Sequence, residues 1–67
     1  MSDEELKAAI RSILEDAGQR LPHDVVIAAL IEQGAAVDLE SIWPQYVRVI
    51  MRAFDVTRHD VGLVVLR

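Results

Sequence analysis

Hydrophobic residues recur in the first part of the chain at the three- and four-residue spacing of an amphipathic helix. The apolar positions on this side are Leu6, Ile10, Ile13, Leu14 and Ala17. Ser2, followed three residues later by Glu5, has the pattern of a capping box, in which each side chain bonds a free amide of the helix start. Gly18 is typical of the left-handed residue that ends a helix. The pattern predicts a first helix over residues 3–17.

The second helical segment, residues 22–33, is apolar almost all round, and its run from residue 25 to residue 31 contains no polar side chain. Pro22 fits the first position of a helix, and Gly34 follows the last turn. We interpret residues 19–21 as a short link. A helix with this pattern lies at the centre of its fold or in an interface.

The third predicted helix, residues 41–54, contains all three aromatic residues of the chain. Pro44 is tolerated in the first turn of a helix, so we place the helix start at Ser41 or at Pro44 itself. At helical spacing one side is apolar, which we expect to face the core, and the other side is polar. The apolar side consists of Trp43, Val47, Ile50 and Phe54, and the polar side consists of Ser41, Gln45, Arg48 and Arg52.

Residues 57–66 fit two structures. Thr57 with Asp60 is similar to a capping box with an acid in place of glutamate, which favours a short fourth helix. The valines of this segment prefer a strand, so a small hairpin between residues 54–57 and 61–66 is the alternative.

An internal similarity favours the fourth helix, because a shift of 36 residues sets His23–Asp24–Val25 over His59–Asp60–Val61 and Leu30 over Leu66. When the chain is shifted by 36 residues, the inner positions of the first helix coincide with a second set of mostly hydrophobic residues. This set is Ile42, Tyr46, Val49, Ile50 and Ala53. Periods of about 20–50 residues are typical of helical repeats, so the chain has the pattern of two helix pairs. We therefore predict a single, mainly α domain over residues 1–67, with three or four helices.

The size and composition of the chain favour support from a partner. A chain of 67 residues buries only about 60% of the surface that its unfolded form exposes. It has no cysteine for a disulfide. Hydrophobic residues make up 52% before glycine is counted, above the roughly 45–50% of ordinary domains with glycine included. We therefore expect apolar surface to be buried against a second copy of the chain or against a larger protein.

The residues do not indicate catalysis. The pairs with catalytic character are His23–Asp24 and His59–Asp60, and a metal site would need three or four converging ligands. The three glycines are isolated, so they form no phosphate loop, and no Gly-x-Ser-x-Gly sequence is present. We expect a protein that is not an enzyme and that binds no cofactor, metal or small-molecule substrate.

Charge is distributed unevenly about a net value of −4. Residues 1–40 carry nine acids and three bases, a balance of −6, whereas residues 41–67 carry four arginines and two aspartates, a balance of +2. Four arginines are far from the basic stripe of a strong nucleic-acid binder. No apolar run approaches the ~20 residues of a membrane span, and the acidic start is unlike a signal peptide. We expect no membrane partner and a cytoplasmic location, or a nuclear one if the source is eukaryotic.

Two surfaces are candidates for binding. The first is a protein interface on the second and third helices, formed by Val26, Ile27, Leu30, Ile31, Trp43 and Tyr46. The second is a set of residues that can donate to base edges or phosphates, namely Gln45, Arg48, Arg52 and Arg58. With so few cations, binding to nucleic acid would be weak and steeply salt-dependent. The alternative for the arginines is that they are solvated or pair with acids of the N-terminal half.

One stretch of the chain has a family-like order of features. In chain order, these are Ile13–Leu14 at a helix end, Ala29–Leu30–Ile31 in the next helix, Gly34 with Val37 in a turn, and Trp43–Pro44 at a helix start. This order resembles the N-terminal domain of the acidic ribosomal stalk proteins of eukaryotes. The resemblance implies an all-helical dimerisation domain that docks on a larger stalk protein, with Val61–Gly62 at the start of a fourth helix.

A second resemblance covers the whole chain. Three helices, the second ended by glycine, followed by a hairpin, are similar to a winged helix-turn-helix domain, including the helical accessory modules of chromatin and polymerase proteins. This resemblance implies that residues 41–54 are a recognition helix. The first hypothesis is therefore a non-catalytic protein-interaction or dimerisation module in a ribosomal or nucleic-acid-associated assembly. The alternative is a winged-helix DNA-binding domain that acts in transcription regulation.

Overall fold

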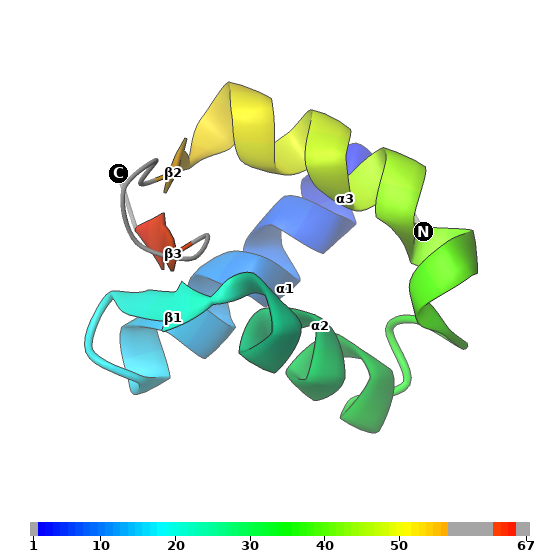
Figure 1. Ribbon diagram of the computed structural model, residues 1–67, viewed down its shortest axis with the longest axis horizontal. Helices are drawn as coiled ribbons and strands as arrows, with labels where there is room; N and C mark the ends of the chain where they lie inside the picture. Colours follow the sequence, from blue (N-terminus) through cyan, green and yellow to red (C-terminus); the bar gives the residue numbers. More distant parts are fainter. Residues whose placement is uncertain (1, 57–62, 66–67) are drawn as a thin grey trace.

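Three helices and a short antiparallel sheet make up the part of the chain that the structure describes, residues 2–56 and 63–65 (Figure 1). In this computed structural model the elements follow the order α1 (Asp3–Asp16), β1 (Arg20–Pro22), α2 (His23–Glu32), α3 (Leu39–Ala53), β2 (Asp55–Val56) and β3 (Leu63–Val65). α1 packs against both α2 and α3, and the sheet lies at one end of the helices (Figure 1). The prediction of a small, mainly α domain is confirmed.

The ends of α1 and α2 follow from their sequences. The Ser2 hydroxyl accepts from the Glu5 amide at 3.1 Å, and the Ser2 amide donates to Glu5 Oε1 at 3.4 Å, which completes the predicted capping box. Gly18 follows α1 with a φ of +87°, and Gly34 follows α2 with a φ of +78°. Both glycines take the left-handed conformation that ends a helix at little steric cost.

α3 begins at Leu39, earlier than either predicted start. The cap is Asp38, whose Oδ1 accepts from the Ser41 amide at 2.8 Å. A carboxylate in this position also complements the positive end of the helix dipole, which favours Asp38 over Ser41 as the cap. The early start places Pro44 in the second turn, where it cannot donate to the Glu40 carbonyl. Both residues are exposed, so water can bond that carbonyl instead.

Of the two structures predicted for residues 57–66, the described part has the hairpin pairing. β3 lies between β1 and β2 and is antiparallel to both, with Val64 opposite Leu21 on one side and Val56 on the other. The predicted fourth helix is therefore wrong for β3, because its consecutive valines prefer the pleated, half-buried surface of a sheet. Residues 57–62, with the predicted cap of that helix, lie outside the described residues.

The predicted link before α2 contains strand β1, which no alternation of polar and apolar residues indicates. The strand is only three residues long and is defined by its pairing with β3. Because β1 is an edge strand, the missing amide of Pro22 leaves the sheet intact. Pro22 is the N-cap of α2, which therefore begins at His23, one residue later than predicted.

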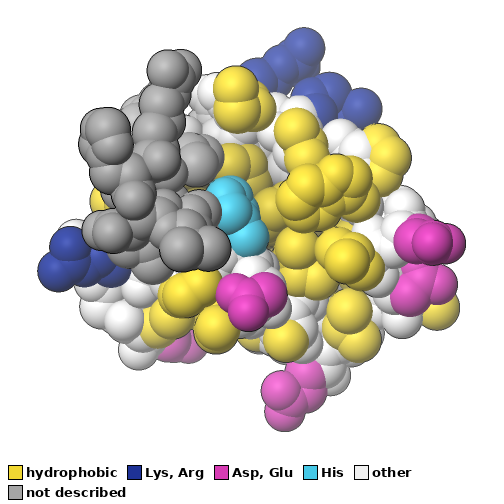
Figure 2. Space-filling model, in the orientation of Figure 1, with side chains coloured by type: hydrophobic (Ala, Val, Ile, Leu, Met, Phe, Trp, Pro, Cys, Tyr) yellow, Lys and Arg dark blue, Asp and Glu magenta, His cyan; other side chains and the backbone are white. Residues whose placement is uncertain are grey.

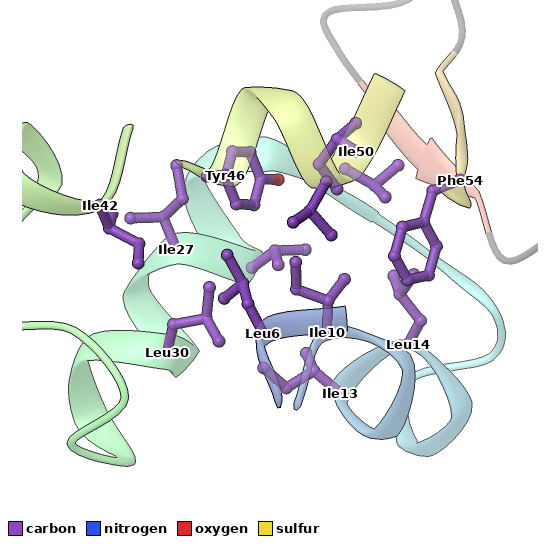
Figure 3. Close-up of a cluster of buried hydrophobic side chains, with 13 residues drawn as sticks. Leu6, Ile10, Ile13, Leu14, Ile27, Leu30, Ile42, Tyr46, Ile50 and Phe54 are labelled. Atoms are coloured by element: carbon purple, nitrogen blue, oxygen red, sulfur yellow. The ribbon is translucent and has the colours of Figure 1, made fainter. Parts of the chain in front are cut away.

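The core lies where the three helices meet β3 (Figure 3). It consists of Leu6, Ile10, Ile13, Leu14, Val26, Ile27, Leu30, Ile42, Tyr46, Val49, Ile50, Phe54 and Val64. The predicted inner side of α1 is confirmed except for Ala17, which is exposed. On α2 the apolar run divides, because Val25 and Ile31 are exposed while the residues between them that face α1 and α3 are buried.

The predicted inner side of the third helix is only partly correct, because Ile50 and Phe54 are buried as predicted but Trp43 and Val47 are not. Trp43 and Val47 are exposed, whereas Ile42, Tyr46 and Val49 are buried together with Ile50. The helix carries more hydrophobic residues than one side can bury, and the buried side is the one that contacts α1 and α2. This orientation leaves a second hydrophobic side of α3 on the surface.

Val26→Ala is expected to lower the free energy of unfolding by about 2 kcal/mol, because it removes fully buried methyl groups and leaves a cavity. Val37→Ala makes the same change at a side chain that is 86% exposed, and it should alter stability by no more than about 0.5 kcal/mol. Urea unfolding followed by circular dichroism measures both. Equal effects of the two changes would contradict this assignment of the core.

Candidate functional site

The outer side of α3 carries four exposed hydrophobic side chains in a row. Their exposed fractions are 50% for Leu39, 46% for Trp43, 38% for Val47 and 70% for Met51. Residues that recur every fourth position form a continuous ridge along a helix. We call these four residues the outer stripe. Figure 2 shows hydrophobic side chains gathered on this face of the molecule, beside the histidine.

Trp43 forms a wall of two hollows on this face. The first has a volume of about 360 Å³ and is lined by Leu39, Glu40, Trp43 and Pro44. The second has a volume of about 170 Å³ and is lined by His23, Trp43, Tyr46, Val47, Ile50 and Met51. Because most of these side chains are apolar, both hollows suit the hydrophobic side chains of a partner.

Ring contacts behind the outer stripe position Trp43. The rings of Trp43 and Tyr46 are stacked, with centroids 5.8 Å apart and an angle of 22° between their planes. His23 meets Tyr46 edge-on, and its Nδ1 lies 2.9 Å from the tyrosine hydroxyl. Burial lowers the pKa of His23 and raises the pKa of Tyr46, which favours the neutral form of both groups. Trp43 therefore rests on an ordered support that extends to α2.

The polar side of α3 is attached to the start of α1. Arg48 donates to both carboxylate oxygens of Asp3, from Nε to Oδ2 at 2.9 Å and from Nη2 to Oδ1 at 2.8 Å. Gln45 Nε2 also donates to Oδ1, at 3.0 Å. The hydrogen bonds from Arg48 and Gln45, together with the charges of Arg48 and Arg52, lower the pKa of Asp3 from 3.8 to about 2. We call this group the Asp3 clamp.

Four of the six residues predicted to form a protein interface are core residues instead. Val26, Ile27, Leu30 and Tyr46 are buried, because the apolar run of α2 packs on α1 and shares one core with the buried side of α3. A buried side chain has no free surface for a partner. The other two predicted interface residues, Ile31 and Trp43, are exposed, and Trp43 belongs to the outer stripe.

Leu39, Val47 and Met51 are surface residues that the sequence pattern does not identify as such. Their spacing of four is visible in the sequence, and it joins them to Trp43 in one row. The spacing does not distinguish a buried row from an exposed one, because α3 has a second apolar row only a small rotation away. Their exposure becomes evident only when α3 is packed against α1 and α2.

Two of the four residues predicted to contact nucleic acid bind Asp3 instead. Gln45 and Arg48 belong to the Asp3 clamp, so the predicted pairing with an acid of the N-terminal half is present for Arg48. Arg52 lies on the same side and lines a cleft of about 290 Å³ together with residues that include Asp3. Arg58 lies outside the described residues.

Two further properties concern the described part of the chain, residues 2–56 and 63–65. It contains no group of three or more His, Cys, Asp or Glu residues placed to hold a metal ion. None of its helices has the length and hydrophobicity needed to cross a membrane.

Comparisons of the chain with family models, with curated proteins and with solved structures found no match. The candidate site is therefore defined by its geometry, namely the outer stripe and the two hollows beside Trp43.

Asp3→Asn is expected to lower stability at neutral pH, because it removes the carboxylate that Arg48 and Gln45 bind. The folded-state pKa of Asp3 is below its unfolded value, so its contribution is present above about pH 4 and is lost as the pH falls toward 2. The difference in Tm between wild type and variant should therefore shrink over that range.

Glu4→Gln is the control for this measurement. It removes an acid from the next position of the same helix turn, where Glu4 pairs only across one turn with Lys7 at 3.4 Å. Its effect on Tm should be smaller than that of Asp3→Asn at pH 7. Thermal unfolding of the three proteins from pH 7 to pH 2 would contradict the clamp if the effect of Asp3→Asn did not change with pH.

Proposed function

We propose that the protein is a non-catalytic protein-interaction module that binds its partner through the outer stripe of α3. The observation that carries this proposal is the unbroken row of Leu39, Trp43, Val47 and Met51 on the surface. Small soluble proteins rarely leave a contiguous apolar patch exposed unless it binds another molecule. The face has no opposing element within the described part of the chain, so a second molecule would have to cover it.

The composition of the outer stripe supports a protein partner. Tryptophan and methionine are enriched at protein interfaces, and tryptophan is frequent among the residues whose truncation costs most binding energy. Trp43 is held by its stacking on Tyr46, so little side-chain freedom remains to be lost on binding. The hollows on either side of Trp43 give a partner's side chains places to insert.

The setting of this module is proposed from the two sequence resemblances. The stalk-protein resemblance implies docking on a larger protein, and the winged-helix resemblance includes accessory modules of polymerase and chromatin proteins. We propose from them a ribosomal or nucleic-acid-associated assembly, and from the acidic, cysteine-free sequence a location in the cytoplasm, or in the nucleus if the source is eukaryotic. Neither resemblance needs a catalytic residue or a cofactor.

Val47→Glu is expected to weaken partner binding at least about tenfold, because it would place an unpaired carboxylate in the middle of a desolvated apolar interface. Val47 is exposed, so the fold should be retained. Ala8→Glu adds the same side chain at an exposed position of α1 outside the outer stripe, and it should leave binding unchanged.

Affinity capture from cells that produce the protein, with quantitative mass spectrometry, compares the two variants with wild type. An untagged copy of the chain is included so that self-association is also counted. Circular dichroism verifies that each variant is folded. The proposal is wrong if Val47→Glu and wild type retain the same proteins in the same amounts, the untagged chain included.

A second candidate function is DNA binding by a winged helix-turn-helix domain. The observation that favours it is the element order, with three helices followed by the antiparallel pair β2–β3, since the winged-helix resemblance implies this order. In such a domain α3 would enter the major groove. Two observations weigh against it. Arg48 and Gln45 are bonded to Asp3, and the outer stripe of α3 is hydrophobic.

Random duplex DNA is expected to show no binding in fluorescence anisotropy at about 50 mM salt, where phosphate contacts are strongest, or at about 200 mM. The DNA candidate requires binding at low salt that weakens steeply with salt. It also requires that Arg48→Ala with Arg52→Ala abolish binding while Arg11→Ala, a change at an exposed arginine of α1, does not. That combination would replace the interaction module with the DNA-binding domain.

A further inference from the structure

We infer that the partner of the outer stripe is a second copy of this chain, related by a twofold axis, with the two α3 helices antiparallel. This inference rests on the proposed function of the outer stripe as a protein interface. A twofold interface uses the same patch on both subunits, so the patch must be complementary to itself when reversed. Both the apolar side chains and the charges of α3 satisfy this condition.

The apolar residues of the outer stripe match their own reversed order. When the twofold axis crosses the outer stripe midway between Trp43 and Val47, Leu39 lies opposite the partner's Met51. Trp43 then lies opposite the partner's Val47. In each pair a large side chain faces a more slender or flexible one. The ridge formed by every fourth residue can then pack into the groove beside the same ridge of the second copy, which is the commonest mode of helix packing.

In this arrangement each of the two hollows faces an apolar side chain of the second copy. Met51 is the most exposed member of the stripe, and a methionine side chain adapts readily to an irregular space. In the antiparallel arrangement it reaches the partner's hollow of about 360 Å³ beside Leu39 and Pro44. The partner's Leu39 in turn reaches the hollow of about 170 Å³ between Val47 and Met51. Each copy therefore fills hollows of the other.

The charges of α3 favour the antiparallel orientation. The helix starts with Asp38 and Glu40 and carries Arg48 and Arg52 in its second half. Two antiparallel copies place the acidic start of each helix near the basic end of the other, whereas a parallel pair places like charges together. Arg48 is largely neutralised by Asp3 in the clamp, so Arg52, in the last turn of α3, contributes most of the positive charge at that end.

Disulfide cross-linking tests the arrangement directly, because the chain has no cysteine of its own. Leu39→Cys and Met51→Cys chains are mixed in equal amounts and oxidised with glutathione disulfide. A disulfide requires Cα atoms within about 7 Å, so only facing positions join efficiently. We expect the mixed 39–51 disulfide at least about fivefold above each of the 39–39 and 51–51 products. Ala8→Cys, at an exposed position outside the stripe, should give only background cross-linking.

Sedimentation equilibrium of the wild-type chain at micromolar concentration should give the mass of a dimer. Val47→Glu acts twice across the axis, so it should raise the Kd of the dimer at least about 100-fold, while Ala8→Glu should leave it unchanged. Circular dichroism verifies that both variants are folded.

Three results would overturn the inference. They are a monomeric wild type, a dimer insensitive to Val47→Glu, and a dimer that forms mainly the 39–39 and 51–51 disulfides. A monomeric wild type that still captures another protein, with capture lost in Val47→Glu, would leave the proposed interaction module intact and exclude only the second copy as its partner.

Discussion

α3 has more hydrophobic side chains than one side of a helix can bury, and the rest of the structure depends on which side faces inward. The core takes Ile42, Tyr46, Val49 and Ile50, which leaves the outer stripe on the surface. Burial of either row would remove a similar amount of apolar surface from water, so the hydrophobic effect alone decides weakly between them. Directional contacts have to make the choice.

Two polar contacts fix the rotation of α3. On one flank Tyr46 points its hydroxyl at His23 of α2, and on the other flank Arg48 and Gln45 bind Asp3 of α1. A rotation that turned Trp43 inward would separate both sets of partners and lose their hydrogen bonds. The clamp and the Tyr46–His23 contact therefore keep the outer stripe exposed, although neither belongs to it.

The same balance explains how much of this structure could be predicted from the sequence. The limits of α1 and α2 follow from local signals within a residue or two, since a capping box and two left-handed glycines act through neighbouring residues. Strand β1 and the buried side of α3 depend on contacts between distant segments, which spacing does not reveal, whereas the strand at β3 was one of the two structures predicted for its segment. The 36-residue shift placed Ile42, Tyr46, Val49 and Ile50 together, whereas the predicted inner side wrongly included Trp43 and Val47. Within the candidate site, the sequence indicated Trp43 as a candidate interface residue but not Leu39, Val47 or Met51.

The Asp3 clamp also separates the two candidate functions physically. A phosphate group would need the same bidentate fork of Arg48 that the Asp3 carboxylate already occupies at 2.8–2.9 Å. DNA binding would therefore have either to displace this intramolecular carboxylate or to do without Arg48, one of few cations. A protein that binds the outer stripe leaves the clamp untouched and benefits from it, because the clamp holds the stripe outward. The contact that weakens the case for nucleic acid is thus the contact that preorganises the apolar face for a protein.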